Sequence, residues 1–269
     1  MRHFNRRARL LFQSMTTAAR PHTQPPPVPP VGPPTEPVGT PGGRAGATKR
    51  GRLRRFWDST IGKKIVMAVS GLIWVGFLVV HMSGNLLAFA GRDSLNHYAK
   101  LLRTIPELLW VARLVLIGAF VAHVISALQL TRASHAARPI GYAEREPQVS
   151  TFASRTIRWG GVLILLFLVY HILHMTLGTV HPRFTHLMPY DNVVNGFTIQ
   201  PLAAVGYSLM MMVIGLHLYH GTWSSIRTLG LARPAVNPLK RRIALGLAVV
   251  VWLGFTAVPV AVLLGILTL

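Results

Sequence analysis

The sequence predicts an all-α integral membrane protein, a bundle of five transmembrane helices of which four form a cofactor-binding core. Of its 269 residues, 51% are hydrophobic and only 13% are charged, whereas a soluble domain carries about 25% charged residues. The apolar residues lie in five continuous runs, each long enough to cross a bilayer, which takes about 20 residues. Because these runs do not alternate with polar residues, they indicate helices rather than the strands of a membrane barrel.

The first 55 residues differ in composition from the rest of the chain. They contain the stretch QPPPVPPVGPPTEPVGTPGG, and such a Pro/Gly tract cannot form a packed core. We therefore predict a disordered, basic segment over residues 1–55 and one membrane domain over residues 56–269. Before Glu36 the segment is rich in Arg and has no acidic residue. That composition resembles a transit peptide, although a cytoplasmic tail or an over-extended reading frame would also explain it.

The basic residues around the five runs predict how the chain crosses the membrane. We expect the spans at about residues 65–90, 107–131, 156–179, 201–226 and 243–268. Fifteen Lys and Arg residues flank these spans on one side, and five flank them on the other. By the positive-inside rule the N-terminus lies in the cytoplasm and the C-terminus outside, as in a multi-pass protein of the bacterial inner membrane. The net charge of +21 follows from this pattern, and we expect no nucleic-acid partner.

The chain contains no cysteine. Disulfides, Cys-ligated zinc and Cys-ligated iron–sulfur clusters are therefore excluded within it. Any bound metal must be held by histidine, carboxylate or methionine. Histidine is the abundant candidate, with 12 copies against 7 for Asp and Glu together.

One histidine lies past the middle of each of the first four spans. These residues are His81, His123, His171 and His217. Each lies about four residues beyond the midpoint of its span, which is about 6 Å along a helix axis. Because neighbouring spans run in opposite directions, His81 and His171 are displaced toward the outside, and His123 and His217 toward the cytoplasm. The sequence thus predicts two histidine pairs at two depths.

Two pairs of histidines on facing helices suit two haems stacked across the membrane. A low-spin haem takes two axial ligands, commonly imidazoles, and helix bundles build cofactor sites from facing helices. Any single buried histidine is more often a hydrogen-bonded core residue, but four at matching depth favour a functional role. Proton relay or metal transport would favour Asp or Glu inside the spans; the span interiors contain none, and Glu107 lies only at the outer end of the second span.

Several other residues leave alternatives open at this point. His174 and His220 each lie three residues after a candidate ligand, so spacing alone does not exclude them, although their depth fits less well. We expect the remaining loop histidines, His97, His135, His181 and His186, to be exposed. Glycines in the spans would admit either a flat macrocycle or a close helix neighbour; they are Gly71, Gly76, Gly84, Gly118, Gly160, Gly161, Gly206 and Gly215. The fifth span has no histidine and is expected to pack outside the four-helix core.

Longer stretches of the chain resemble a known family. From about residue 60 to the C-terminus the chain resembles the cytochrome b membrane-anchor subunit of succinate:quinone oxidoreductases, in the five-helix, two-haem class that includes fumarate reductases. The pattern HxxHGxWSxxxTLG, which begins at His217, is the most specific. The matching stretches are LVVHMSGNLLAFAGRDSLNHYAKLLR, AHVISALQLT, SRTIRWGGVLILLFLVYHILH, YDNVVNGF and GLHLYHGTWSSIRTLGL.

The resemblance implies a set of ligands, cofactors and partners. It assigns His123 and His217 to a haem b near the dehydrogenase face, and His81 and His171 to a distal haem b, in preference to His174 and His220. It implies a flavoprotein subunit with FAD that oxidises succinate, an iron–sulfur subunit that passes electrons to this anchor, and a membrane quinone that receives them. Some fumarate reductases of this class carry a Glu two residues before the fourth ligand, where this chain has Gly215.

The remaining expected site residues lie near the ends of the spans. Haem propionates need cationic or hydrogen-bonding partners, and for the inner haem we expect these from Arg227, Arg158 and Ser70. On the outer side Arg103 and Arg113 are candidates. Any of these arginines can instead be an interfacial anchor. We expect a quinone head to exchange protons near Glu107 and His97, beside Asn96.

Three functions are therefore compatible with the sequence. The first is the haem-binding anchor of succinate dehydrogenase. The second is the cytochrome b anchor of fumarate reductase or of another respiratory enzyme, such as a hydrogenase or a formate dehydrogenase. The third is a transporter or a structural anchor without a cofactor.

Overall fold

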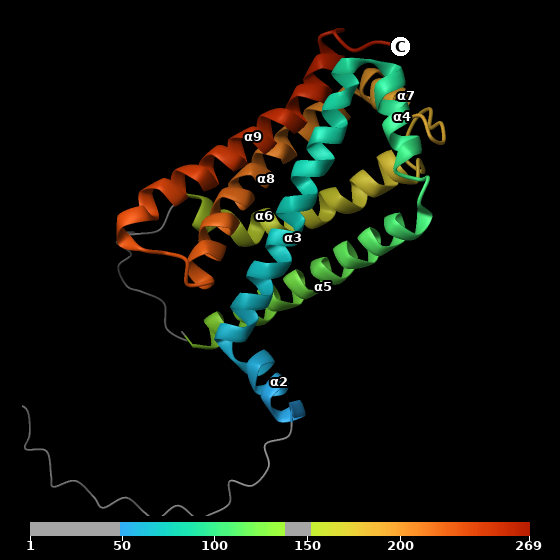
Figure 1. The fold of residues 1–269 in the computed structure, drawn as a ribbon. Helices are drawn as coiled ribbons and strands as arrows, with labels where there is room; N and C mark the ends of the chain where they lie inside the picture. The colour runs from blue at the N-terminus through green and yellow to red at the C-terminus, as the bar shows by residue number, and fades with distance from the viewer. Residues whose placement is uncertain (1–48, 138–151) are drawn as a thin grey trace, which may run out of the picture. The chain divides into compact units, whose positions relative to one another are not determined.

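All the regular secondary structure in the described part of the chain is helical. The computed structural model describes residues 49–137 and 152–269, and these contain no strand. The long helices are α3 (Thr60–Leu86), α5 (Pro106–Ala136), α6 (Phe152–His171), α8 (Pro201–Thr228) and α9 (Asn237–Leu263). All five are long and apolar enough to cross a membrane (Figure 1). The predicted all-α bundle with five membrane-spanning helices is confirmed.

Shorter helices lie at the ends of the bundle. They are α2 (Lys49–Asp58), α4 (Arg92–Leu101) and α7 (Pro189–Ile199). α2 lies at the opposite end from α4 and α7 (Figure 1). All the described residues belong to one compact unit, and the predicted domain boundary at residue 55 falls inside α2 and stays a prediction. The rest of the predicted N-terminal segment, residues 1–48, lies outside the described residues.

Local signals set where the long helices begin and end. α3 begins at Thr60 because the Ser59 hydroxyl accepts a hydrogen bond of 2.9 Å from the Gly62 amide, which caps the helix. α6 continues into a π-helical turn, Ile172–Thr176. α9 ends at Leu263 rather than near 268 as predicted, because Gly265 has a φ of +68°, a conformation that glycine adopts readily and that ends helices.

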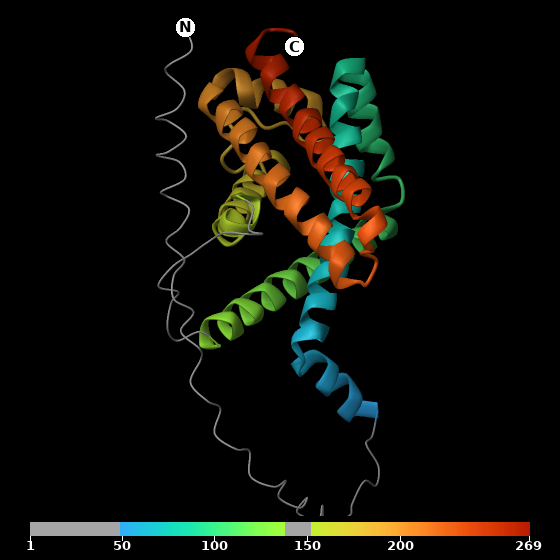
Figure 2. The ribbon, with the colours of Figure 1, turned by 90° about the vertical axis from the view of Figure 1, so that its left-hand side faces the viewer.

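Helices α3 and α8 form the centre of the bundle. α3 packs against α5, α8 and α9, and α8 packs against α6 and α9. α8 and α9 run side by side (Figure 2). α9, the fifth membrane helix, thus packs on both central helices, whereas the sequence predicted that it would pack outside the four-helix core. Many large apolar side chains of these helices are exposed, among them Leu202, Trp159 and Ile61, as expected for a surface that faces lipid.

The loops after the first and third membrane helices meet at one end of the bundle. There α4 packs against α7, and the Arg92 guanidinium forms an ion pair with the Asp191 carboxylate at 2.5 Å. We call this part of the protein the cap. It consists of α4, α7 and residues 177–188, which lead into α7. The Tyr190 hydroxyl donates to the Thr268 carbonyl at 2.9 Å, which holds the C-terminal residues against the cap.

Candidate functional site

Four histidines from four different helices meet in two pairs. His81 on α3 faces His171 at the end of α6, with ring centres 6.0 Å apart. His123 on α5 faces His217 on α8, with ring centres 6.3 Å apart. All four side chains are half-buried. The structure therefore brings together the members of each pair that the depth argument predicted.

The spacing within each pair fits one metal ion held between two imidazoles. A first-row metal binds an imidazole nitrogen at about 2 Å, so a metal with one ring on either side separates the ring centres by about 6 Å. We name the pairs by their predicted sides of the membrane: the outer pair is His81 and His171, and the inner pair is His123 and His217. The two rings are inclined at 76° in the outer pair and at 55° in the inner pair. Rotation of each ring about its metal–nitrogen bond allows such angles. The donor set and its spacing fit haem iron.

The surroundings of His123 orient its ring. Its Nδ1 lies 3.0 Å from the Met67 carbonyl on α3, so Nδ1 carries the hydrogen and donates it, and Nε2 has its lone pair free for a metal. Ligand histidines in metalloproteins are commonly held by such a bond. Gly71 leaves room for the ring, since a Cβ there would lie 3.3 Å from its Cε1 atom.

Ser70 lies beside the same ring. Its hydroxyl is 2.7 Å from the Val66 carbonyl and 3.4 Å from His123 Nδ1, and the residue is buried. The hydroxyl therefore donates its hydrogen bond within α3 and lies next to the imidazole of His123. For His217, Nδ1 is buried and has no hydrogen-bond partner among the described residues.

The outer pair lies among aromatic side chains. The His81 ring stacks on Phe77, with centres 5.2 Å apart and planes at 10°. Phe255 of α9 approaches the same ring to 5.6 Å, and Phe167 stacks on His171 at 5.9 Å. These rings exclude water from the space around the pair, which is one of the protein's means of setting the potential of a redox group.

Tyr207 connects His171 to His174. Its hydroxyl lies 3.3 Å from Nδ1 of His171 and 3.1 Å from Nδ1 of His174. The π-helical turn that begins at Ile172 carries His174, and such turns occur often at functional sites. His174 is fully buried, and its Nε2 has no hydrogen-bond partner among the described residues.

His174 and His181 also lie close together, but their rings are nearer to each other than the rings in the two pairs. Their ring centres are 5.0 Å apart. Both nitrogens of His181 are already used, since Nε2 donates to the Asn192 carbonyl at 2.7 Å and Nδ1 accepts from the Arg183 amide at 3.0 Å. His181 is therefore a structural residue of the cap. The expectation that it would be exposed is wrong, because these bonds hold it under α7 with 9% exposure.

The other histidines lie farther from the pairs. His220 is half-buried on α8. His97 lies on α4 and His135 at the end of α5, so both are in helices rather than in loops. His186 is exposed, as expected.

Gly161, like Gly71, lies against a histidine ring, since an added Cβ would be 3.9 Å from His217 Cε1. Other glycines divide between helix packing and open space. Gly215 packs on α9, where an added Cβ would lie 3.3 Å from Trp252 Cβ. Gly84 lies against the Tyr98 ring of α4, with only 2.6 Å for an added Cβ. At Gly76, Gly118 and Gly206 an added Cβ would meet nothing within 4 Å. The sequence alone could not separate these two groups.

The residues expected at the propionates have varied surroundings. Arg227 is exposed. Arg158 is also exposed, and its Nη1 donates to His135 Nε2 at 3.0 Å. The outer candidates have local partners: Arg103 donates to the Ala99 carbonyl at 2.9 Å, and Arg113 lies over the Trp110 ring at 4.9 Å. This local use is typical of interfacial anchors.

The two residues expected at the quinone lie on exposed surface near the cap. Glu107 is in the first turn of α5, and His97 projects from α4. Asn96, next to His97, is buried instead: its amide donates to Asp191 at 3.2 Å and its oxygen accepts from the Tyr190 amide at 3.1 Å. Asn96 therefore stabilises the cap.

A buried carboxylate, which sequence reasoning missed, holds the cap together. The Asp191 side chain is only 10% exposed. Burial alone raises the pKa of its carboxyl, but the hydrogen bonds from Arg92 and Asn96 outweigh burial and hold this pKa below its usual range. Tyr207 was missed as well. Asp191 could have been singled out because acidic residues are rare in this basic chain. Nothing in the apolar pattern around Tyr207 indicated a role for that residue.

Comparison with known proteins gives no further identification. No family model matches the chain, and neither a curated protein nor a solved structure matches it. The class that the described residues define is an all-α, multi-pass membrane bundle with two facing histidine pairs.

Proposed function

We propose that the chain is a di-haem cytochrome b, the membrane-anchor subunit of a succinate:quinone oxidoreductase. The observation that carries this proposal is the two facing histidine pairs, whose ring centres lie 6.0 and 6.3 Å apart, a separation that would suit one haem iron held by each pair. When bound, the two haems supply one-electron transfer. Their placement on successive layers of the bundle supports a path across the membrane.

The chain's own residues have defined tasks in this proposal. His123 and His217 hold the inner haem, and His81 and His171 hold the outer one. Met67 fixes the ring of His123 through its carbonyl, and Tyr207 contacts that of His171. Arg227 and Arg158 are the proposed propionate partners at the inner haem. Aromatic side chains keep water from the outer pair.

The partners follow from the same proposal. FAD and iron–sulfur clusters belong to a flavoprotein subunit and an iron–sulfur subunit, since this chain has no cysteine to hold a cluster. The iron–sulfur subunit docks at the basic, cytoplasmic end in a bacterial inner membrane. A membrane quinone accepts the electrons, or donates them if the complex works as a fumarate reductase. An anchor of a hydrogenase or formate dehydrogenase is the alternative within the same class.

Reduction of the native complex by its own substrate tests this function. The complex is purified through a tag on this chain, and its absorption spectrum is followed while succinate is added. We expect the bands of b-type haem to appear in the reduced form, and the flavoprotein and iron–sulfur subunits to copurify. Formate and hydrogen serve as matched donors. Reduction by one of these and not by succinate would move the chain to the other respiratory enzymes, and a colourless, well-folded preparation would refute the proposal.

A further inference from the structure

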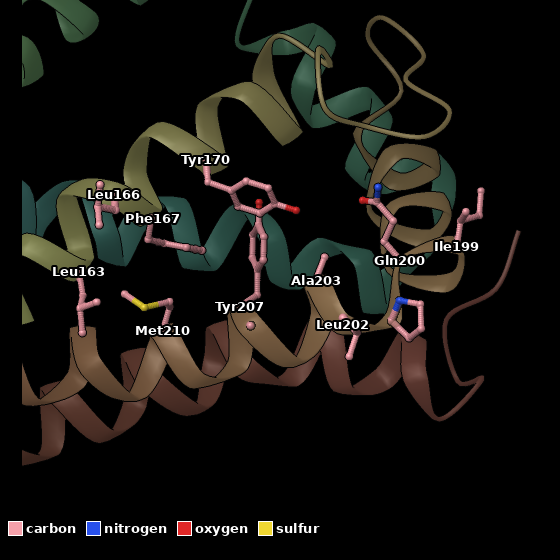
Figure 3. A pocket seen from close by; sticks show the side chains of 12 residues that line it. Leu163, Leu166, Phe167, Tyr170, Ile199, Gln200, Leu202, Ala203, Tyr207 and Met210 are labelled. Atoms are coloured by element: carbon pink, nitrogen blue, oxygen red, sulfur yellow. The ribbon is translucent and has the colours of Figure 1, made fainter.

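A groove opens on the surface of the bundle between α6 and α8. Its volume is about 800 Å³, and Figure 3 shows the side chains that line it. Its rim includes Leu166 and Leu202, which are 62% and 85% exposed, so the groove is accessible from the outside of the bundle. On membrane-spanning helices that outside is lipid. An apolar molecule dissolved in the bilayer can therefore reach it.

The polar groups of the groove lie at one end and in its middle. Gln200 is at the junction of α7 and α8, and Tyr170 and Tyr207 lie in the middle, between Gln200 and Met210 (Figure 3). The other lining residues are apolar or glycine, and they extend along α8 as far as Met210. Met210 lies ten residues after Gln200, which is about 15 Å of helix. The groove thus fits a molecule with a small polar head and a long apolar tail.

Hydrogen bonding is incomplete beside Gln200. Its buried Oε1 and the Nε2 of His174 make no hydrogen bond of normal length among the described residues, although the two side chains lie within interaction range of each other. Unpaired buried polar groups are costly, and they are common where a ligand completes the bonds. No Lys or Arg lines the groove, so it has no partner for the phosphate of a phospholipid head.

The groove lies next to the outer histidine pair. If His171 binds iron through Nε2, its Nδ1 carries a hydrogen and donates it to the Tyr207 oxygen at 3.3 Å. The Tyr207 hydroxyl then donates to Nδ1 of His174 at 3.1 Å. The hydrogen of His174 is consequently on Nε2. One hydrogen-bonded chain thus runs from a candidate ligand through Tyr207 to His174, whose Nε2 side faces the groove-lining residue Gln200.

We propose that this groove binds the head of a membrane quinone against Gln200, Tyr170 and Tyr207, with the isoprenoid tail along the apolar part. The Gln200 amide nitrogen and the Tyr170 hydroxyl can donate to the carbonyl oxygens of a quinone, and Gln200 Oε1 can accept from the hydroxyl of the quinol; the position beside His171 places the head next to the outer haem site. This inference rests on the proposed function. It moves the quinone away from Glu107 and His97, where the sequence predicted it.

The matched variants Gly206→Leu and Gly246→Leu test the proposal. Both glycines are in membrane helices, and an added Cβ at either meets nothing within 4 Å, but only Gly206 lines the groove. With decyl-ubiquinone or a short-chain menaquinone as acceptor, we expect Gly206→Leu to raise the quinone KM at least about tenfold, and Gly246→Leu to leave it unchanged. Both variants should keep the wild-type haem content and wild-type reduction of a soluble dye. Gln200→Leu, which removes the amide, should also raise the KM.

Photolabelling gives a readout that does not depend on turnover. An azido derivative of the short-chain quinone is irradiated with the native complex, and the labelled peptides are identified by mass spectrometry. We expect the label around Tyr170 or between Gln200 and Met210, and its loss in Gly206→Leu. Label near Glu107 and His97, or a phospholipid that quinone does not displace from the groove, would overturn the inference. A complex without haem would refute the proposed function instead, whatever the position of the label.

Discussion

The two histidine pairs differ in a side-chain contact that the Tyr207 hydroxyl makes with the outer pair. It meets Nδ1 of His171 in the outer pair, whereas Nδ1 of His217 in the inner pair is without a partner among the described residues. A hydrogen bond accepted from a ligand imidazole makes that ligand more basic and favours the oxidised metal. The midpoint potential of a haem at the outer site should therefore depend in part on the Tyr207 side chain.

The variant Tyr207→Phe tests this contact. Loss of the hydrogen bond should raise the midpoint potential of one haem, on the order of 40 mV for a bond worth about 1 kcal/mol, and leave the other haem unchanged. Tyr219→Phe is the matched control, because the Tyr219 hydroxyl accepts from Arg241 at 2.7 Å and touches neither pair. A redox titration of the purified complex measures both potentials. Equal shifts of both haems, or none, would show that Tyr207 does not act on His171.

Asp191 is the second residue whose environment has a measurable consequence. Its carboxyl pKa lies below the usual value of 3.8 because of Arg92 and Asn96. The ion pair therefore adds stability above about pH 4, and this contribution is lost as the pH falls through the lowered pKa. Asp191→Asn should lower the melting temperature of the complex at pH 7, by the same amount from pH 5 to 8, and the difference from wild type should shrink at lower pH.

The exposed Asp93 on α4 provides the control for that variant. Asp93 lies in the first turn of α4 and interacts with Arg92 without a hydrogen bond to it, so Asp93→Asn should lower the melting temperature much less than Asp191→Asn does at pH 7. A pH dependence that is the same for both variants would mean that Asp191 and Arg92 do not stabilise the cap.

At the scale of elements, the contact between α8 and α9 depends on a small residue. Gly215 brings α8 close to Trp252 and to the Ala248 carbonyl, and small residues allow such approach between membrane helices. Gly215→Val should destabilise the bundle by about 1–3 kcal/mol, the usual cost of overpacking. Gly246→Val, which adds its side chain to open space, should cost much less. Unfolding in detergent compares the two, and equal losses would contradict the close packing.

The sequence predicted the long helices better than the short ones. Uninterrupted apolar runs marked all five spans, because a bilayer requires such runs whatever the neighbours are. α4 and α7 were not predicted because they are short and are stabilised by contacts between distant segments, such as Arg92 with Asp191. The histidine pairs were predictable from depth alone, whereas Tyr207 and the groove arise from the relative rotation of α6 and α8, which composition does not encode.

At the scale of the whole molecule, the predicted orientation of the chain in the membrane can be tested by labelling. The chain has no cysteine, so one introduced cysteine is its only thiol. His186→Cys places it in the exposed loop before α7, and Ala235→Cys in the exposed turn before α9. A membrane-impermeant maleimide added to intact cells should label the first and not the second, because basic loops stay in the cytoplasm. The reverse result would invert the topology.

The central claim is that each facing pair of histidines holds one haem, and its most direct measurement is the haem content per chain in single and double variants. Wild type should contain two haems, and each of His81→Ala, His123→Ala, His171→Ala and His217→Ala should contain one. The double variant of His81 and His171 should still contain one, because both residues serve the same haem, whereas the double variant of His81 and His123 should contain none. His186→Ala is the control and should keep both. Loss of both haems when only one pair is removed, or a wild type without haem, would contradict the account.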